Sequence, residues 1–167
     1  MKNPAYRITL LGVCTAAAMV LSYIETLIPV SVAVPGIKLG LANIVAIFLL
    51  VKFDWKHAAA VSLVRVLLTA LLFGNAASLA YSASGAALSM LVMALLKGSD
   101  RFTAVGISAA GAVAHNAGQI LMAILLTGTA HIVYWLPPLI LSGAATGAAI
   151  GAAGALLIKK VRVKGEN

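Results

Sequence analysis

Ionisable side chains are rare in this chain, so those that interrupt apolar runs are the first candidates for chemistry. Arg65 lies within an apolar run, and Ser62 and Thr69, at i−3 and i+4, share its face if the run is helical. An ionisable group is costly in apolar surroundings and tends to face a bundle interior or a cavity. Two interpretations remain open: Arg65 holds an anionic or carbonyl group of a ligand, or it forms a structural ion pair with Glu25.

A second polar group interrupts the apolar run between residues 102 and 126. His115 and Gln119 are one helical turn apart, and Asn116 lies alongside them. Amide and imidazole side chains in apolar surroundings need hydrogen-bond partners, either on neighbouring helices or on a polar ligand. The three residues are therefore candidate ligand contacts, with helix packing as the alternative.

Lys38 and Asn43 flank the start of another apolar run. An apolar but proline-bounded segment, from Pro29 to Gly36, comes directly before them. Irregular backbone is not tolerated in contact with lipid, so this segment must pack on protein or line a cavity. We expect it to be a lid over an outward-facing pocket, with Lys38 and Asn43 at the mouth. The alternative is an ordinary helix start whose lysine reaches the membrane interface.

The residue types give little support to enzyme or metal chemistry. The chain has four carboxylates and none lies near another in sequence, whereas magnesium-dependent diphosphate chemistry normally needs clustered carboxylates. The sequence contains no phosphate loop of the form GxxxxGK[ST], no HExxH and no GxSxG. Cys14 is the only cysteine, which excludes a thiolate cluster. We therefore expect neither catalysis nor a metal or other cofactor.

The elements that position these residues are predicted to be membrane helices. Hydrophobic residues make up 62% and charged residues 10% of the 167, against about 25% charged in soluble domains. A spanning helix needs roughly 20 apolar residues, which leaves no room for an extramembrane domain. We predict an all-α integral membrane protein with a single domain, residues 1–167, and six transmembrane helices. The predicted spans are about 8–28, 39–53, 57–73, 76–96, 102–126 and 136–158.

The distribution of charge predicts the orientation of these helices. With the N-terminus in the cytoplasm, ten of the twelve Lys and Arg residues fall in cytoplasmic segments, and only Lys38 falls in an outside loop. We expect a multi-pass protein of the cell membrane, in contact with membrane lipid, with both termini cytoplasmic. The basic residues form no patch interleaved with exposed aromatics, which argues against nucleic acid as a partner despite the net charge of +8.

Small residues repeated every four positions predict close helix packing. Packing within the monomer and docking against another membrane protein both fit such stripes. The first span offers a similar small-residue surface at Gly12 and at residues 16–18. The stripes in the last two spans are Gly106, Ala110, Ala114 and Gly118, and then Gly143, Gly147, Gly151 and Ala155.

Two segments, Pro-Gly-Ile-Lys-Leu-Gly-Leu-Ala-Asn at 35–43 and Ala-His-Asn-Ala-Gly-Gln at 114–119, resemble the Gx transporter family. Its members are also labelled heptaprenyl diphosphate synthase component I, and the family is similar to the substrate-binding S components of energy-coupling-factor (ECF) transporters. The resemblance spans nearly the whole chain. It implies a six-helix S-component-like bundle that docks onto a transmembrane coupling subunit driven by two ATPase subunits. The docking residues that it implies are Gly12, Ala16, Ala18 and Ser22, an approximate form of the AxxxA pattern of S components.

The residues and the resemblance leave two hypotheses for function. The first is a subunit that captures a small vitamin-like or precursor molecule from outside and passes it to coupling and ATPase subunits. The second is a non-catalytic membrane partner of enzymes of polyprenyl diphosphate or quinone biosynthesis. The ligand-binding residues of the first hypothesis are Lys38, Asn43, Arg65, His115, Asn116 and Gln119.

Overall fold

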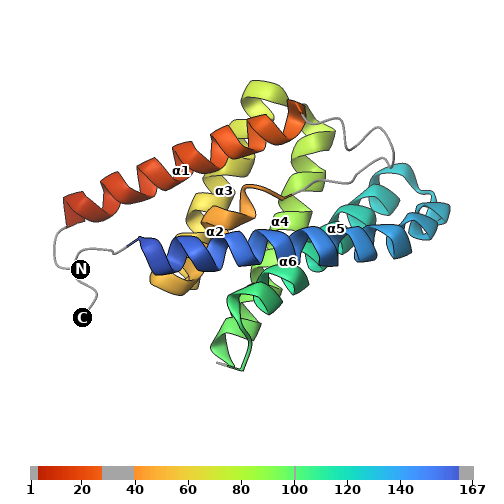
Figure 1. Cartoon of the computed structure of the whole chain (residues 1–167). Coiled ribbons are helices and arrows are strands. Elements are labelled where there is room, and N and C mark those ends of the chain that lie inside the picture. Colours follow the sequence, from red (N-terminus) through yellow and green to blue (C-terminus); the bar gives the residue numbers. More distant parts are fainter. Residues whose placement is uncertain (1–3, 28–39, 100, 162–167) are drawn as a thin grey trace.

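The computed structural model describes residues 4–27, 40–99 and 101–161, which form a bundle of helices (Figure 1). The described residues contain no strand, so the all-α prediction is confirmed for them. Six elements are α-helices and one, η2, is a 3₁₀ helix. In chain order they are α1 (Pro4–Leu27), α2 (Asn43–Lys52), α3 (Trp55–Phe73), α4 (Ala76–Gly98), α5 (Ala104–Thr127), η2 (Ala130–Trp135) and α6 (Leu136–Lys160).

Five stretches of the described chain are long and apolar enough to cross a membrane: α1, α3, α4, α5 and the continuous stretch of η2 and α6. The remaining helix, α2, has 10 residues and rises only about 15 Å, against a hydrocarbon core about 30 Å thick. Of the predicted second span, 39–53, the described part is therefore helical only over residues 43–52. Helix length supports five of the six predicted spans and leaves the sixth crossing unestablished.

Polar side chains cap the starts of three of the long helices. Asp54 caps α3, Thr103 caps α5, and Asn75 and Ser78 form a reciprocal capping box at the start of α4. Each cap satisfies an amide that has no partner inside the helix. α5 is followed directly by Gly128, whose φ of 67° is a left-handed conformation that glycine adopts without steric strain.

α5 is the central helix and packs most extensively against α4 and α6. A Cβ on Gly118 would lie 2.7 Å from the Ser84 carbonyl oxygen of α4, and one on Gly147 would lie 2.8 Å from Ala109 Cα of α5. These neighbours are backbone atoms, so only the missing side chain lets the helices approach this closely. Packing within the monomer is therefore confirmed for part of the predicted stripes. The glycines of these stripes that are in interhelical contact are Gly118 on α5 and Gly143, Gly147 and Gly151 on α6.

The short helix α2 lies in the core of the bundle. Its residues 45–50 are all buried, and Ile47 and Leu49 have no exposed surface. α2 packs mainly on α3 and α6. A Cβ on Gly154 of α6 would lie 2.6 Å from Ile47 Cγ2, so glycine is what lets α6 pass this close to α2. A helix too short to cross the bilayer is thus enclosed by longer helices.

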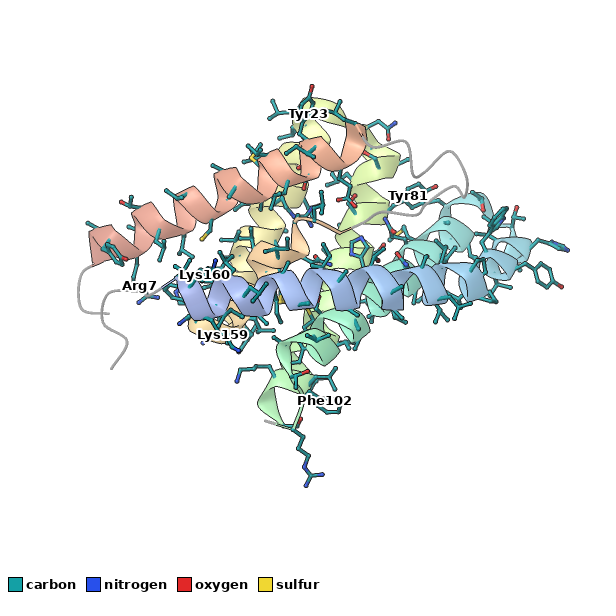
Figure 2. The ribbon with its side chains drawn as sticks, viewed as in Figure 1. Arg7, Tyr23, Tyr81, Phe102, Lys159 and Lys160 are labelled. Carbon is teal, nitrogen blue, oxygen red and sulfur yellow. The ribbon has the colours of Figure 1, made fainter. Side chains whose placement is uncertain are left out.

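The start of α1 and the end of α6 lie at the same end of the molecule (Figure 1). Figure 2 shows Arg7, Lys159 and Lys160 near one another at that end, whereas Tyr23 and Tyr81 lie away from it. The described ends of the chain therefore share one side of the bundle, which agrees with the same-side termini predicted from charge.

Further basic residues lie at the same end of the bundle. The corner between α2 and α3 is tied to the first turns of α1 because the guanidinium of Arg7 contacts the ring of His57. Lys52 ends α2 and Lys56 lies in the first turn of α3, on either side of that corner. We call this region the basic end, and define it by Arg7, Lys52, Lys56, Lys159 and Lys160.

Candidate functional site

Arg65 lies in a polar cluster between α1 and α3, away from the basic end. Its Nη1 donates a hydrogen bond to Ser22 Oγ over 3.1 Å, and Glu25 lies close enough to interact with it electrostatically. Glu25 Oε1 in turn accepts a hydrogen bond from the Gly40 amide. We call these four residues, Ser22, Glu25, Gly40 and Arg65, the polar cluster. It connects α1 and α3 to Gly40, which lies just before α2.

The polar cluster bears directly on the two interpretations of Arg65. The electrostatic partnership with Glu25 that the sequence suggested is present. The hydrogen bond to Ser22 is an additional, structural use of the guanidinium, which has five N–H donors. Contact with a ligand is a separate question and stays a prediction.

The polar residues expected beside Arg65 lie in different surroundings. The Thr69 hydroxyl, one turn along α3, is buried and has no hydrogen-bond partner in the structure. Ser62, one turn back, instead lines a groove between α3 and α4. Ser62 and Thr69, on either side of Arg65, therefore lie in different surroundings.

Asn43 lies next to the polar cluster. The backbone N–H of Asn43 donates to the Gly40 carbonyl over 2.8 Å, which closes a turn directly before α2. Gly40 has a φ of 72°, and a Cβ there would lie 3.3 Å from Asn43 Nδ2, so glycine suits this position on both counts. Lys38, the predicted companion of Asn43, lies outside the described residues, as does the predicted lid.

The three polar residues of α5 divide between two interfaces. His115 and Gln119 face Gly85 of α4: a Cβ on Gly85 would lie 2.9 Å from His115 Cε1 and 3.0 Å from Gln119 Cγ. Asn116 faces α6, where its Nδ2 donates to the Leu139 carbonyl over 2.7 Å, and it is 5% exposed. The amide nitrogen of Asn116 therefore serves the contact between α5 and α6.

Ser84 makes a contact between helices that the sequence did not single out. Its hydroxyl lies 3.0 Å from the Gly118 carbonyl of α5 and 3.0 Å from the Tyr81 carbonyl of its own helix. A serine hydroxyl in a helix commonly bonds to a carbonyl of its own helix. The sequence around Ser84 therefore gives no sign of the contact with α5.

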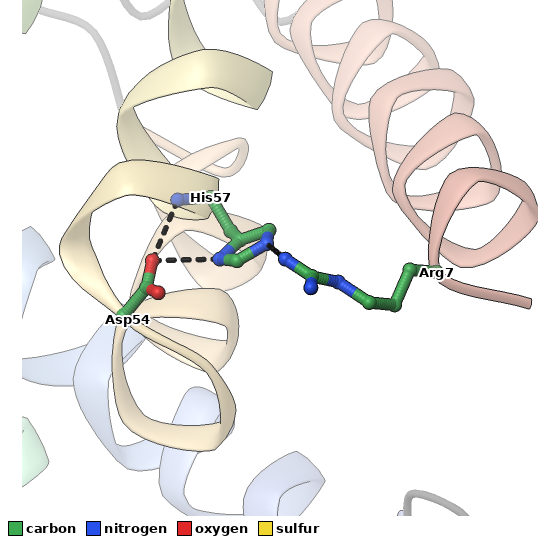
Figure 3. Close-up of polar contacts among 3 residues, drawn as sticks. All are labelled: Arg7, Asp54 and His57. Carbon is green, nitrogen blue, oxygen red and sulfur yellow. Dashed lines mark hydrogen bonds and ion pairs between the residues drawn. The ribbon is translucent and has the colours of Figure 1, made fainter. Parts of the chain in front are cut away.

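A second polar arrangement, at the basic end, was also missed from the sequence (Figure 3). The guanidinium of Arg7 carries only donors, so it donates to His57 Nε2. His57 Nδ1 lies 2.6 Å from Asp54 Oδ1. The same carboxylate oxygen accepts from the His57 amide over 2.9 Å. Arg7, His57 and Asp54 therefore join the start of α1 to the cap of α3.

These contacts shift the acidity of Asp54. Partial burial on its own would raise the pKa of Asp54, but hydrogen bonds from the amide and the ring of His57 outweigh it. The pKa of Asp54 accordingly lies below its ordinary value, and the carboxylate is held in its charged form as a helix cap.

The candidate docking residues of α1 lie on two faces. Gly12 and Ala16 are exposed, and a Cβ on Gly12 would have no neighbour within 4 Å. Ala18 and Ser22 are buried, at 2% and 6% exposure. The open face of α1 therefore includes the first pair, while the second pair packs inside the bundle.

A groove of about 550 Å³ runs between α3 and α4. Trp55, Ala59, Ser62, Leu63 and Val66 of α3 form one wall, and seven residues between Ala83 and Leu95 of α4 form the other. No group of three or more His, Cys, Asp or Glu side chains among the described residues is placed to hold a metal ion.

The helices and their buried polar contacts are those of a polytopic membrane protein. A family model, described as heptaprenyl diphosphate synthase component I, matches residues 14–157. The chain belongs to this family, as the segments at 35–43 and 114–119 indicated. No protein of curated function and no solved structure matches the chain.

Proposed function

We propose that the protein is a membrane-embedded binding subunit that captures a small molecule on the side opposite its basic end. The observation that carries the proposal is the polar cluster: an arginine within a span, linked through Glu25 to the chain that leads into α2. Buried ionisable groups in membrane spans are usually functional because they are costly to retain. The ligand is then passed to separate coupling and ATPase subunits, as in ECF S components.

The cluster also indicates the kind of ligand that is favoured. Glu25 lies close enough to Arg65 to interact with its charge, so a strongly anionic ligand would have to compete with a carboxylate already present. A neutral polar molecule or a zwitterion meets both charges at once. Asn43, Gln119 and His115 are the other proposed contacts, together with Lys38. We omit Asn116, because its amide nitrogen is bonded to α6.

The proposed orientation places the basic end in the cytoplasm and both termini with it. Membrane proteins keep an excess of Lys and Arg on the cytoplasmic side of their short loops. The polar cluster then lies toward the outer side of the cell membrane.

Native mass spectrometry of gently purified protein tests the proposal. The wild-type protein is expected to retain a small molecule, and Arg65→Gln is expected to lose it. Arg101→Gln is the matched control, because Arg101 is exposed and lies before the start of α5. Equal retention by Arg65→Gln and the wild type would contradict the proposal. Unfolding of Arg65→Gln in detergent would show that Arg65 is a structural residue.

The family description favours a second candidate function. A protein described as component I of heptaprenyl diphosphate synthase implies a further component, and this chain would be its non-catalytic membrane partner. Co-purification separates the two candidates. Soluble prenyltransferase subunits would support the second candidate, and coupling and ATPase subunits would support the first.

A further inference from the structure

The groove between α3 and α4 is produced by missing side-chain volume. Half of its twelve lining residues are alanine or serine, on both helices. Leu63, Leu91 and Leu95 on its walls are 59%, 56% and 67% exposed, so the groove opens outward. In a spanning bundle, exposed leucines on long apolar helices face lipid. The groove therefore opens sideways into the bilayer.

The length of the groove matches one leaflet. Trp55 and Val66, the limits of its α3 wall, are eleven residues apart, or about 16 Å along a helix. Half of the hydrocarbon core is about 15 Å. Because Trp55 is the first residue of α3, beside the basic end, the groove runs from that interface to the middle of the membrane.

The lining of the groove is apolar apart from Ser62 and the indole N–H of Trp55. An elongated apolar groove of about 550 Å³ that opens into lipid suits a hydrocarbon chain.

The mouth of the groove carries a positive charge. Lys56 Nζ lies 5.9 Å from the centre of the Trp55 ring, and Trp55 lines the groove. Tryptophan and lysine together are typical of the membrane interface, where lysine meets anionic headgroups. We propose that the groove holds an acyl chain of an anionic phospholipid of the surrounding bilayer, with the headgroup phosphate at Lys56. This site is separate from the polar cluster and does not depend on the proposed function.

Quenching of Trp55 fluorescence by brominated lipids tests this inference. The chain has two tryptophans, so Trp135→Phe leaves Trp55 as the only tryptophan, which can be excited selectively over tyrosine. Vesicles would contain increasing fractions of brominated phosphatidylglycerol or brominated phosphatidylcholine. Half-maximal quenching is expected at a mole fraction about fivefold lower for phosphatidylglycerol, the preference that one interfacial lysine supplies.

Four further variants locate the effect. Lys56→Gln is expected to bring the two quenching curves together, whereas Lys160→Gln, which removes an exposed lysine of α6, leaves them apart. Ala87→Phe, on the wall of the groove, is expected to weaken quenching by both lipids. Circular dichroism and monodispersity confirm that each variant is folded, and Ala94→Leu serves as a second, milder obstruction.

Three outcomes would overturn the inference. Equal quenching by the two lipids in the Trp135→Phe protein would mean ordinary contact with bulk lipid. An equal loss of preference in Lys56→Gln and Lys160→Gln would assign the preference to the whole basic end. Relief of quenching by geranylgeranyl diphosphate at a lower mole fraction than by unbrominated phosphatidylglycerol would make an isoprenoid the occupant.

Discussion

Arg65 of α3 donates a hydrogen bond to the hydroxyl of Ser22 of α1 over 3.1 Å, although the two residues are 43 positions apart. Ser22 is 6% exposed, so water competes little for this bond. Together with the contact between Arg7 and His57 at the other end of α1, it gives that helix two polar attachments to α3.

Removal of the Ser22 hydroxyl tests the inner attachment. Ser22→Ala is expected to lower the free energy of unfolding in mixed micelles by about 1 kcal/mol, as for other hydrogen bonds between membrane helices. Thr15→Ala is the control on the same helix, because the Thr15 hydroxyl donates to the Leu11 carbonyl one turn back. A similar loss in both variants would mean that the bond to Arg65 adds nothing specific.

Two glycine substitutions are expected to have opposite effects. Gly147→Ala would push a methyl group against the backbone of α5 and destabilise the protein by about 1–3 kcal/mol. Gly12→Ala meets no neighbour within 4 Å and is expected to stabilise α1 by about 0.5–1 kcal/mol. Unfolding curves of the two variants and the wild type would give the sign of each change in the free energy of unfolding. A neutral Gly147→Ala would show that α5 and α6 do not pack this closely.

Acidification is expected to weaken the start of α3. The pKa of Asp54 is lowered in the folded protein, so its ionised form stabilises the fold above the ordinary aspartate value of about 3.9. That contribution is lost as the pH falls through the lowered pKa. Asp54→Asn keeps a capping oxygen but cannot titrate. Between pH 6 and pH 3, the thermal unfolding temperature of the wild type should therefore fall more steeply than that of Asp54→Asn. Parallel curves of unfolding temperature against pH would contradict this account.

The contact between Arg7 and His57 is expected to hold down the first turns of α1. His57→Phe retains a ring for the tilted contact with Phe53 but removes the acceptor nitrogen. Hydrogen exchange in the first turns of α1 should then become faster. Arg7→Gln should have the same effect, and the double variant should add little to either. Additive effects of the two substitutions would mean that these residues do not act through each other.

The orientation in the membrane can be read by cysteine labelling in a Cys14→Ser background. Tyr134, in η2, is 76% exposed, and Lys160 ends α6 at the basic end. On intact cells, an impermeant maleimide is expected to label Tyr134→Cys, and to label Lys160→Cys only after permeabilisation. The reverse pattern would invert the proposed orientation.

Hydropathy and small-residue spacing predicted much of the fold. The long apolar runs became the five membrane-length stretches, because lipid demands internally satisfied backbone over some 20 residues. The glycine repeat from Gly143 to Gly151 became a packing surface. Whether α2 crosses the membrane was less predictable, since an apolar run of this length fits either a buried helix or part of a span.

The polar contacts could be predicted only in part. An arginine in a span needs an acid or a ligand, so the partnership of Arg65 with Glu25 was foreseeable. The direction in which Asn116 points depends on how α5 is rotated against its neighbours, which a sequence does not state. Arg7 and His57 are 50 positions apart, and exposed basic residues near helix ends carry no sign of pairing.

The burial of α2 has a consequence for the order in which the protein is made. Residues 43–52 are synthesised before α3 and α6, the two helices that cover them most. A segment this short cannot span the bilayer alone, so it becomes buried only when α3 and α6 pack around it. Gly154, against which Ile47 packs, lies in the last turns of α6. Assembly of the bundle is therefore completed only after α6 has been synthesised, and a chain that stops before α6 leaves the most apolar helix exposed for cellular quality control to detect.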